Sequence, residues 1–415
     1  MHALPEGGQS WPEIEATLSG YNARDYRWRE GKLPYFVWCT EPEILEVQRK
    51  AWQLYDVENA LGAKRAFPSL DRMEREVVEM ALGLLGGTAT SGGSFTSGGT
   101  ESNFLALKAA RTRARRRDPN IGRMNVVVPE TAHPSFRKGA DILDLDVTLV
   151  PYDSEHRSDV AAMARAIDEN TILLLGSAPN FPTGTFDRIR ELGQLALQHD
   201  LWLHVDACVG GPLAPFARDL GHPVPDFDLS VPGVTTLSAD LHKYGYTAKG
   251  ASLILYRDAA DLAFQEFTVE WASGTYATPS FLGTRPGGAI AASWAVMHYL
   301  GERGYLERAR LVLETVRKLQ RGIEAIPGLT VVRPRDLCIL LYGSNDPALD
   351  MNAVADALGR RGWFVGRAAK PFACVQMAIN PVHAGFADEY LADLRASVEE
   401  VRESGARADF DKGSY

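Results

Sequence analysis

Cysteine, basic charge and long apolar runs are all scarce in this chain of 415 residues. It has four cysteines, and the two nearest in sequence, Cys338 and Cys374, lie 36 positions apart, so there is no CxxC motif for zinc or redox chemistry. Such a low cysteine content is typical of a reducing compartment, and we expect the cytoplasm. With 44 basic and 53 acidic side chains the net charge is −9, which argues against nucleic acid as a partner.

Apolar runs and metal-ligand patterns are missing as well. No stretch of about 18 apolar residues occurs, and the sequence opens without an apolar stretch of signal-peptide length, so we expect no membrane anchor. His133, His204 and His242 are not spaced as metal ligands, so we expect no metal site. The 45% of hydrophobic and 23% of charged residues are ordinary for a globular protein, which excludes the disordered, collagen-like and coiled-coil classes.

An α/β pattern begins near residue 95, where short β-branched runs alternate with helical stretches. These runs lack polar alternation, and strands of that kind are buried on both faces of a mostly parallel sheet. The predicted strands are 125–128, 147–150, 171–175, 201–205, 235–237 and 252–256, and the predicted helices between them are 100–117, 160–169 and 188–199.

The flanking regions differ from this pattern. The first 40 residues have no clear periodicity and predict an irregular arm, whereas helical periodicity covers 42–61. A long helical region, 287–326, is broken near Gly301 and Gly304, and the residues after it predict a small α+β unit. We therefore expect an N-terminal arm and helix over 1–60, a large domain over 61–300 and a small C-terminal domain over 301–415.

One motif joins glycines to a helix start. Ser97-Gly98-Gly99-Thr100-Glu101-Ser102 precedes a helical sequence. Glycines let a backbone approach an anion closely, and a helix start offers free N–H groups and the positive end of the helix dipole. The hydroxyls of Ser97 and Thr100 add donors, so the motif is a candidate phosphate cup. It has no Gly-Lys-Ser/Thr and is not a P-loop; a Ser/Thr-capped helix is the alternative interpretation.

Three further motifs follow predicted strands. Asp206 ends the apolar strand LWLHVD, at the edge where open α/β sheets bind ligands, and a buried carboxylate there needs a cationic partner. Lys243 lies in the loop SADLHKYGY, with His242 and Lys249 near enough in sequence to lower the pKa of its amine, as imine formation requires. His133, after the strand NVVVP, is a candidate to stack on a planar ring. Taken singly, each has an alternative interpretation: Asp206 as the cap of the next turn, Lys243 as an ordinary lysine of a surface loop, and His133 as a structural histidine.

Together these motifs point to one cofactor. An anion cup, a ring-stacking histidine, a strand-end aspartate and an imine-forming lysine follow one another along the chain. Pyridoxal 5'-phosphate (PLP) needs these four parts for its phosphate, its ring face, its ring nitrogen and its aldehyde. We therefore expect PLP as the cofactor.

The sequence also resembles a known family. The segments TSGGTESNFLALKAAR, VVVPETAHPSF, HVDACVGG, LSADLHKYGYTAKGASLILYRD and GTYATPSFLGTRPGG are similar to the sphingosine-1-phosphate lyase branch of the group II PLP-dependent decarboxylases. The string HKYGYxxKG is the most specific of them. The resemblance implies an α/β, fold-type I PLP-dependent transferase fold with a mostly parallel seven-stranded sheet in the large domain. It also implies a homodimer with a shared active site.

The resemblance assigns roles to individual residues. It implies that Lys243 holds the cofactor through an imine, that Asp206 pairs with the ring nitrogen and that His133 stacks on the ring. Tyr246 is a candidate for proton transfer. The implied phosphate ligands are Gly99, Thr100, Ser238, His242 and, across the dimer interface, Gly283 and Thr284; the implied substrate ligands are Asn59 and Lys249.

The chain departs from the family pattern around Asn59. Family members carry Asn-Pro-Leu-His before Phe-Pro-Ser, and here the stretch reads NALGAKRAFPS, so the asparagine is kept and the histidine that contacts the substrate phosphate is replaced. A family tyrosine with the same task aligns with Trp38. Lys64 or Arg65 is a candidate substitute anion ligand; the alternative is that both are ordinary surface cations.

The implied activity is that of a PLP-dependent carbon–carbon lyase, which cleaves the Cα–Cβ bond of a β-hydroxy amine and releases an aldehyde. An L-amino-acid decarboxylase is the alternative, because the same electron sink accepts electrons from a Cα–carboxylate bond. A non-catalytic cofactor-binding scaffold is a third possibility, but it gives no reason for a complete set of Lys243, Asp206 and His133. In each case the partner is a small molecule.

Overall fold

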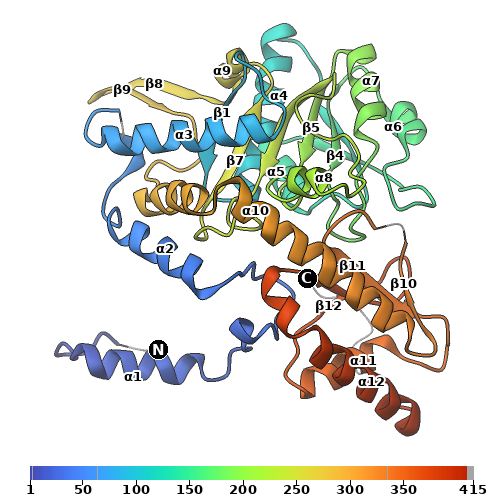
Figure 1. The fold of residues 1–415 in the computed structure, drawn as a ribbon. Coiled ribbons are helices and arrows are strands. Elements are labelled where there is room, and N and C mark those ends of the chain that lie inside the picture. The colour runs from blue at the N-terminus through green and yellow to red at the C-terminus, as the bar shows by residue number, and fades with distance from the viewer. Residues whose placement is uncertain (2, 63, 334, 409–415) are drawn as a thin grey trace.

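The computed structural model describes residues 1, 3–62, 64–333 and 335–408. Its centre is a seven-stranded sheet covered by helices, and a four-stranded sheet lies with the C-terminal helices at the lower right of Figure 1. The strands of the large sheet are, in spatial order, β1 (Gly92–Thr96), β7 (Ser252–Tyr256), β6 (Val234–Ala239), β5 (Trp202–Asp206), β4 (Thr171–Ser177), β2 (Asn125–Pro129) and β3 (Asp146–Val150).

The large sheet is mostly parallel, as the sequence predicted. β3, β2, β4, β5 and β6 pair in parallel, whereas β7 pairs antiparallel with both β6 and β1. The six predicted strands are confirmed. The sequence pattern missed β1, because its residues GGSFT hold two glycines and only one β-branched side chain.

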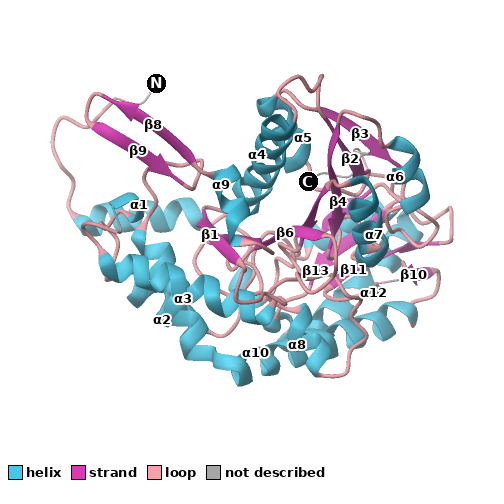
Figure 2. Ribbon diagram, turned by 90° about the horizontal axis from the view of Figure 1, so that it is seen from above, coloured by secondary structure: helices cyan, strands magenta, loops and turns pink. Residues whose placement is uncertain are grey.

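Helices cover both faces of this sheet (Figure 2), which is why its strands read as continuous apolar runs. In β2, Val127 belongs to one apolar core, and Val126 and Val128 belong to the other. The core of Val126 includes α4 (Gly99–Arg117), α5 (Ser135–Leu143) and α9 (Leu262–Gln265); the core of Val127 includes α3 (Pro68–Leu84), α6 (Val160–Ala166), α7 (Ile189–His199), α8 (Ala214–Asp219) and α10 (Gly287–Glu324).

The C-terminal part is a smaller α+β unit. Its four strands pair antiparallel in the order β10 (Leu329–Val331), β11 (Ile339–Ser344), β13 (Cys374–Ala378) and β12 (Gly366–Ala368), and its helices are α11 (Met351–Arg360), η4 (Pro381–Gly385) and α12 (Ala387–Ser404). α10 crosses from the large sheet into this unit. The predicted helix break is confirmed at Gly301, with φ 53° and ψ −176°, whereas Gly304 lies in continuous helix. The three-part division of the chain stays a prediction, and its final residues, 409–415, lie outside the described residues.

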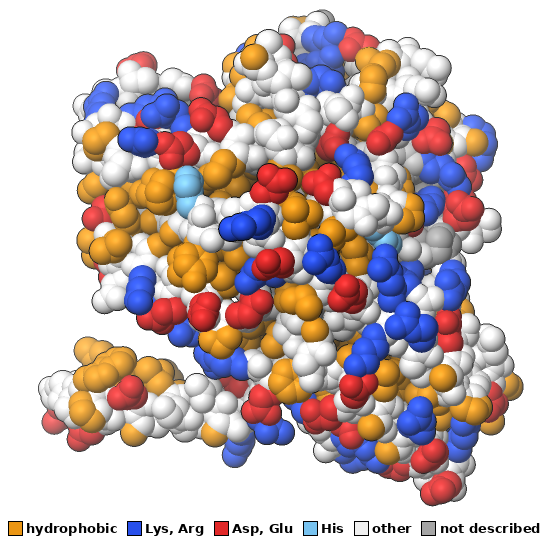
Figure 3. All heavy atoms as spheres, in the orientation of Figure 1, with side chains coloured by type: hydrophobic (Ala, Val, Ile, Leu, Met, Phe, Trp, Pro, Cys, Tyr) orange, Lys and Arg blue, Asp and Glu red, His pale blue; other side chains and the backbone are white. Residues whose placement is uncertain are grey.

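The N-terminal region corrects two expectations. The predicted irregular arm contains a helix, α1 (Trp11–Asn22), that buries none of its residues and stands apart from the rest of the chain (Figures 1 and 3). The helix predicted over 42–61 is shorter in the structure, where α2 spans Pro42–Gln53. The residues after it do not continue the helix, because they pair with the segment before α10: the backbone N–H of Ala60 donates to the carbonyl of Arg285 (3.0 Å). The short helices nearby are η1 (Trp28–Glu30) and η2 (Ala60–Gly62).

A hairpin that the sequence pattern did not predict projects from the large sheet. It consists of β8 (Phe267–Trp271) and β9 (Gly274–Thr278), follows η3 (Ala259–Asp261) and α9, and is exposed along most of its length. Among the described residues, no helix is both long enough and apolar enough to cross a membrane.

Candidate active site

The predicted motifs meet at one edge of the large sheet. Asp206 ends β5 beside Ser238 of β6, and the loop 240–249 follows β6. His133 lies just beyond β2, and the glycine cup follows β1, which runs in the same direction. Because the carboxyl ends of parallel strands share one edge, segments far apart in sequence converge there.

Lys243 is held by a buried carboxylate. Its Nζ lies 3.0 Å from Oδ2 of Asp240 and 5.4 Å from the ring centre of Trp38. Burial acts to raise the pKa of Asp240, but the charges of Lys243 and His242 outweigh it and bring this pKa to about 2. Burial acts to lower the pKa of Lys243, and Asp240 outweighs it in turn and raises that pKa. The expectation that neighbouring cations lower the pKa of Lys243 is therefore wrong, because Asp240 keeps the lysine protonated while it is its partner.

The glycine cup lies beside this ion pair. A Cβ on Gly99 would stand 2.6 Å from Sγ of Cys208 and 2.9 Å from both carboxylate oxygens of Asp240, so only glycine lets the start of α4 come this close. Thr100 is exposed at the same helix start. The hydroxyl of Ser97, by contrast, donates to Glu101 (2.7 Å), so it is already engaged within the chain.

His242 lies next to both the cup and Asp240. Its Nδ1 accepts the backbone N–H of Ala251 (3.3 Å), and its Nε2 lies 3.5 Å from Oδ2 of Asp240. Burial lowers the pKa of His242 to about 4, so the ring is neutral near pH 7 with its proton on Nε2. A Cβ on Gly98 would lie 3.5 Å from Cε1 of this ring, which places the histidine at the cup.

Lys249 shares Trp38 with Lys243. Its Nζ lies 4.8 Å from the centre of the Trp38 ring and donates to the carbonyl of Phe36 (3.3 Å). Although much of the side chain is exposed, burial around the ammonium and then the charge of Lys243 lower the pKa of Lys249 to about 8. Two cations thus face one aromatic ring.

Asp206 is buried, and both of its carboxylate oxygens have partners within the chain. Its Oδ1 accepts the backbone N–H of Cys208 (3.1 Å) and faces the hydroxyl of Ser238 (3.4 Å), while its Oδ2 accepts Nδ2 of Asn103 (3.1 Å). Ser238 therefore contacts Asp206, and its implied role at the cofactor phosphate stays a prediction. Asn103 was not predicted from the sequence.

His133 and Tyr246 flank the same edge. Nδ1 of His133 accepts both the hydroxyl (2.8 Å) and the backbone N–H (3.2 Å) of Ser135, and burial lowers its pKa. Tyr246 has a φ of 56°, unusual and strained for a bulky residue, and it closes a turn onto the carbonyl of Lys243 (3.0 Å). Its buried hydroxyl has no hydrogen-bond partner among the described residues, so its role in proton transfer stays a prediction.

The remaining predicted residues form a second group. Nδ2 of Asn59 donates to Oγ1 of Thr284 (3.2 Å), Oδ1 of Asn59 accepts the backbone N–H of Arg285 (3.3 Å), and Thr284 is exposed next to Gly283. In the part of the chain that the structure describes, no hydrogen bond or ion pair joins this group to Lys243. Lys64 and Arg65 are exposed as well, and their role as anion ligands stays a prediction.

Comparisons with known proteins agree with this geometry. Residues 59–339 match the family model described as the pyridoxal-dependent decarboxylase conserved domain. The sphingosine-1-phosphate lyase of Oryza sativa subsp. japonica is 38% identical, over 98% of this chain and 76% of its own length. The chain belongs to the sphingosine-1-phosphate lyase branch of the pyridoxal-dependent decarboxylase family.

Solved structures support the same family. A sphingosine-1-phosphate lyase from Burkholderia pseudomallei K96243 is 36% identical with a TM-score of 0.91, over 97% of this chain and 94% of that one. A glutamate decarboxylase from Lactobacillus brevis CGMCC 1306 is 19% identical with a TM-score of 0.85, over 97% of this chain and 95% of that one, and it shares the fold. The fold-type I expectation is confirmed, and this family member is a PLP-dependent lyase.

The residues of this lyase fit PLP. Thr100 is exposed at the start of α4, where the helix dipole favours negative charge, so this helix start is open to an anion such as the cofactor phosphate. Oδ1 of Asp240 is buried without a hydrogen-bond partner among the described residues, which shows that the site has polar capacity that the chain does not itself use. Asp206 and Lys243 supply the carboxylate and the amine that the cofactor's ring nitrogen and aldehyde require.

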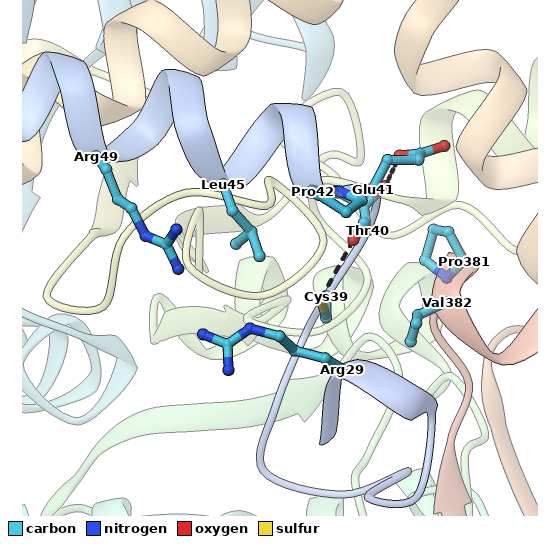
Figure 4. Close-up of a pocket in the computed structure, with 9 residues that line it drawn as sticks. All are labelled: Arg29, Cys39, Thr40, Glu41, Pro42, Leu45, Arg49, Pro381 and Val382. Atoms are coloured by element: carbon cyan, nitrogen blue, oxygen red, sulfur yellow. Dashed lines mark hydrogen bonds between the residues drawn. The ribbon is translucent and has the colours of Figure 1, made fainter. Parts of the chain in front are cut away.

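An open cavity lies where the N-terminal arm meets the start of α2. It measures about 280 Å³, and Figure 4 shows Arg29 and Arg49 pointing their guanidinium groups toward the same opening. The rest of its lining comes from the arm, the start of α2 and η4: Cys39, Thr40, Glu41, Pro42, Leu45, Pro381 and Val382. A second cavity, of about 240 Å³, has His133 in its wall.

Proposed function

We propose that this lyase cleaves the Cα–Cβ bond of a β-hydroxy amine that carries an anionic group, and that it releases an aldehyde. The observation that carries the proposal is the placement of Lys243 and Lys249 against one ring, that of Trp38 (5.4 and 4.8 Å). One amine is available for the cofactor and a second cation for the anionic end of a substrate. The relatives described above are named for such a substrate, sphingosine 1-phosphate.

PLP, when bound, supplies the sink for the electrons of the breaking bond. Asp206 would hold positive charge at the ring nitrogen of the bound cofactor, and its contacts with Cys208 and Asn103 fix the carboxylate in place. Asp240 forms an ion pair with Lys243 whenever that amine is free and charged. With the cofactor bound, Lys243 would react as the uncharged amine, and its proton would pass to solvent, because the pKa of Asp240 is about 2 and its carboxylate does not accept it.

Lys249 orients the substrate. The bond that breaks is the one that stands perpendicular to the cofactor ring, so rotation about Cα decides between carbon–carbon cleavage and loss of carbon dioxide. A substrate fixed at its amine and at its anionic end has little freedom for that rotation. Lys249 therefore contributes to the choice of bond as well as to binding.

The enzyme works as a homodimer in this proposal. Gly283, Thr284 and Asn59 share no hydrogen bond with Lys243 of the same chain in the described residues, and Thr284 is exposed, as a residue that serves a partner's site must be. A cytoplasmic location also belongs to the proposal, because all four cysteines are buried and free.

The test is an assay for products with the PLP-loaded protein. We expect aldehyde from a phosphorylated long-chain amino alcohol, no carbon dioxide from α-amino acids, and neither product from Lys243→Ala. The matched variant Lys249→Gln should raise KM for the phosphorylated substrate more than for its unphosphorylated counterpart. Carbon dioxide from an amino acid without aldehyde release would instead identify a decarboxylase.

A further inference from the structure

Asn103 lies at the centre of a buried hydrogen-bond network behind the cofactor residues. It is 1% exposed on α4, and its Nδ2 lies 3.1 Å from Oδ2 of Asp206 and 3.0 Å from Oγ of Ser135. Its Oδ1 lies 3.2 Å from Nε2 of His204. The amide of Asn103 thus contacts Asp206 directly and Ser135, the residue that is hydrogen-bonded to His133.

The direction of these hydrogen bonds follows from what each group can donate. The Asp206 carboxylate only accepts, so Nδ2 of Asn103 faces it and Oδ1 faces His204, whose Nε2 must carry a proton. Burial lowers the pKa of His204 to about 4, so its ring is neutral and Nδ1 accepts from Thr236 (2.9 Å). Thr236 in turn accepts from the indole of Trp202 (2.8 Å), which only donates.

The strand geometry explains why these residues meet. Trp202, His204 and Asp206 occupy alternate positions of β5 and point to the same face, the one that α4 covers. Thr236 lies opposite His204 in β6. Donors and acceptors match at every step from the indole to the carboxylate, so the network has a single arrangement.

A second branch runs from Asn103 to His133. Nδ2 of Asn103 donates to Oγ of Ser135, whose hydroxyl donates to Nδ1 of His133 (2.8 Å). The backbone N–H of Ser135 donates to the same nitrogen (3.2 Å), so Nδ1 carries no proton and the ring is fixed in one tautomer.

We propose that Asn103 is a positioning residue that sets Asp206 and His133 relative to each other, and with them the edge and the face of the PLP ring. The proposal rests on the roles proposed above for those two residues. A planar cofactor is held against rotation and tilt only when both are fixed, and a single amide bridges them.

Cofactor affinity tests this role without substrate. In Asn103→Leu, which has a similar shape and no polar atoms, the PLP dissociation constant measured by fluorescence should rise about 10- to 100-fold. The control is Asn125→Leu, because the amide of Asn125 is also buried and also binds a carboxylate, that of Asp168 (2.7 Å), at the opposite edge of the sheet. An equal rise in both variants, or none in Asn103→Leu, would overturn the proposal.

A second variant keeps the test independent of folding. Asn103→Asp is nearly isosteric, and near pH 7 it sets a carboxylate against Asp206. We expect weak PLP binding that recovers as the pH falls and the new carboxyl becomes protonated and can donate; binding without this pH dependence would contradict the proposal. Failure of the unmodified protein to bind PLP would instead contradict the proposed function, so the two failures are distinguishable.

Discussion

Lys243 and Lys249 have the same side chain and opposite pKa shifts. Asp240 lies 3.0 Å from Lys243 and keeps it charged. No ion pair to Lys249 occurs among the described residues, and burial and the charge of Lys243 lower its pKa. Identical residues six positions apart are thereby suited to different tasks, one as a held amine and one as a cation that titrates near pH 8.

This difference predicts a pH dependence. The pKa of Lys249 is about 8, so the side chain is cationic below that pH and loses its charge above it. KM for an anionic substrate should therefore rise as the pH increases from about 7 to about 9. Lys249→Arg keeps its charge over this range and should flatten the KM profile. Steady-state kinetics on both proteins measure the effect, and parallel profiles would show that Lys249 does not bind the anion.

Among single residues, those that directly follow a strand are easier to predict from the sequence than those that work by positioning another residue. Asp206, Lys243 and His133 could be found because the end of a strand is where α/β proteins bind ligands. Asp240 and Asn103 could not, because their importance comes from contacts made only in the folded chain. Ser97 illustrates the reverse, since its hydroxyl looked available in sequence and is engaged by Glu101 in the structure.

Two elements are joined by one carboxylate. Oε2 of Glu101 accepts the backbone N–H and the hydroxyl of Ser97 (both 2.7 Å), and its Oε1 accepts the backbone N–H of Phe281 (2.8 Å). The cup after β1 is thus fastened to the loop that carries Gly283 and Thr284.

Loss of this fastening should weaken cofactor binding. Glu101→Gln replaces one acceptor oxygen by a donor, so at least one of these contacts is lost and PLP affinity should fall about tenfold. Glu191→Gln, on the exposed side of α7, is the matched control. Equal affinities of the two variants, measured by fluorescence titration, would show that the carboxylate has no part in forming the cup.

Two glycines in helices should respond oppositely to alanine. Gly301 has positive φ and extended ψ, a region essentially restricted to glycine, so Gly301→Ala should destabilise the protein by about 1 to 3 kcal/mol. Gly359 lies in regular helix α11 with open space around its Cβ position, so Gly359→Ala should stabilise by about 0.5 to 1 kcal/mol. Urea midpoints of the two variants check both signs, and a stable Gly301→Ala would show that α10 can straighten.

Helices and strands were predictable where their burial pattern was regular. The core strands and α4, α6 and α7 follow from periodicity, because both faces of the sheet are covered. α1 could not be found in this way, because it buries none of its residues and so has no apolar stripe toward a core. β1 was not predicted because two of its five residues are glycines. The β8–β9 hairpin was not predicted because most of its residues are exposed.

Exposed apolar side chains on α1 and on β8 support the proposed homodimer at the scale of the whole molecule. Trp11 and Tyr21 are 64% and 75% exposed, and Trp271 is 60% exposed. Surfaces of this kind are typical of interfaces between subunits.

A shared site predicts rescue between inactive subunits. Lys243→Ala and Thr284→Trp should each be inactive alone, the second because a bulky ring obstructs the partner's site. After unfolding and refolding together, the hybrid dimer has one intact site, and activity should return to about a quarter of the unmodified value. No recovery, with hybrids confirmed by mass spectrometry, would place Thr284 and Lys243 in the same subunit's site.

The position of β1 at the edge of the sheet also determines when, during synthesis of the chain, the glycine cup can form. β1 pairs only with β7 within the large sheet, and every parallel strand of that sheet lies between the two in sequence. Pairings between distant segments form slowly, because a long loop must close first. A chain emerging from the ribosome therefore exposes its glycine cup early but cannot complete it until β7 has been synthesised and added, so cofactor capture follows the addition of β7.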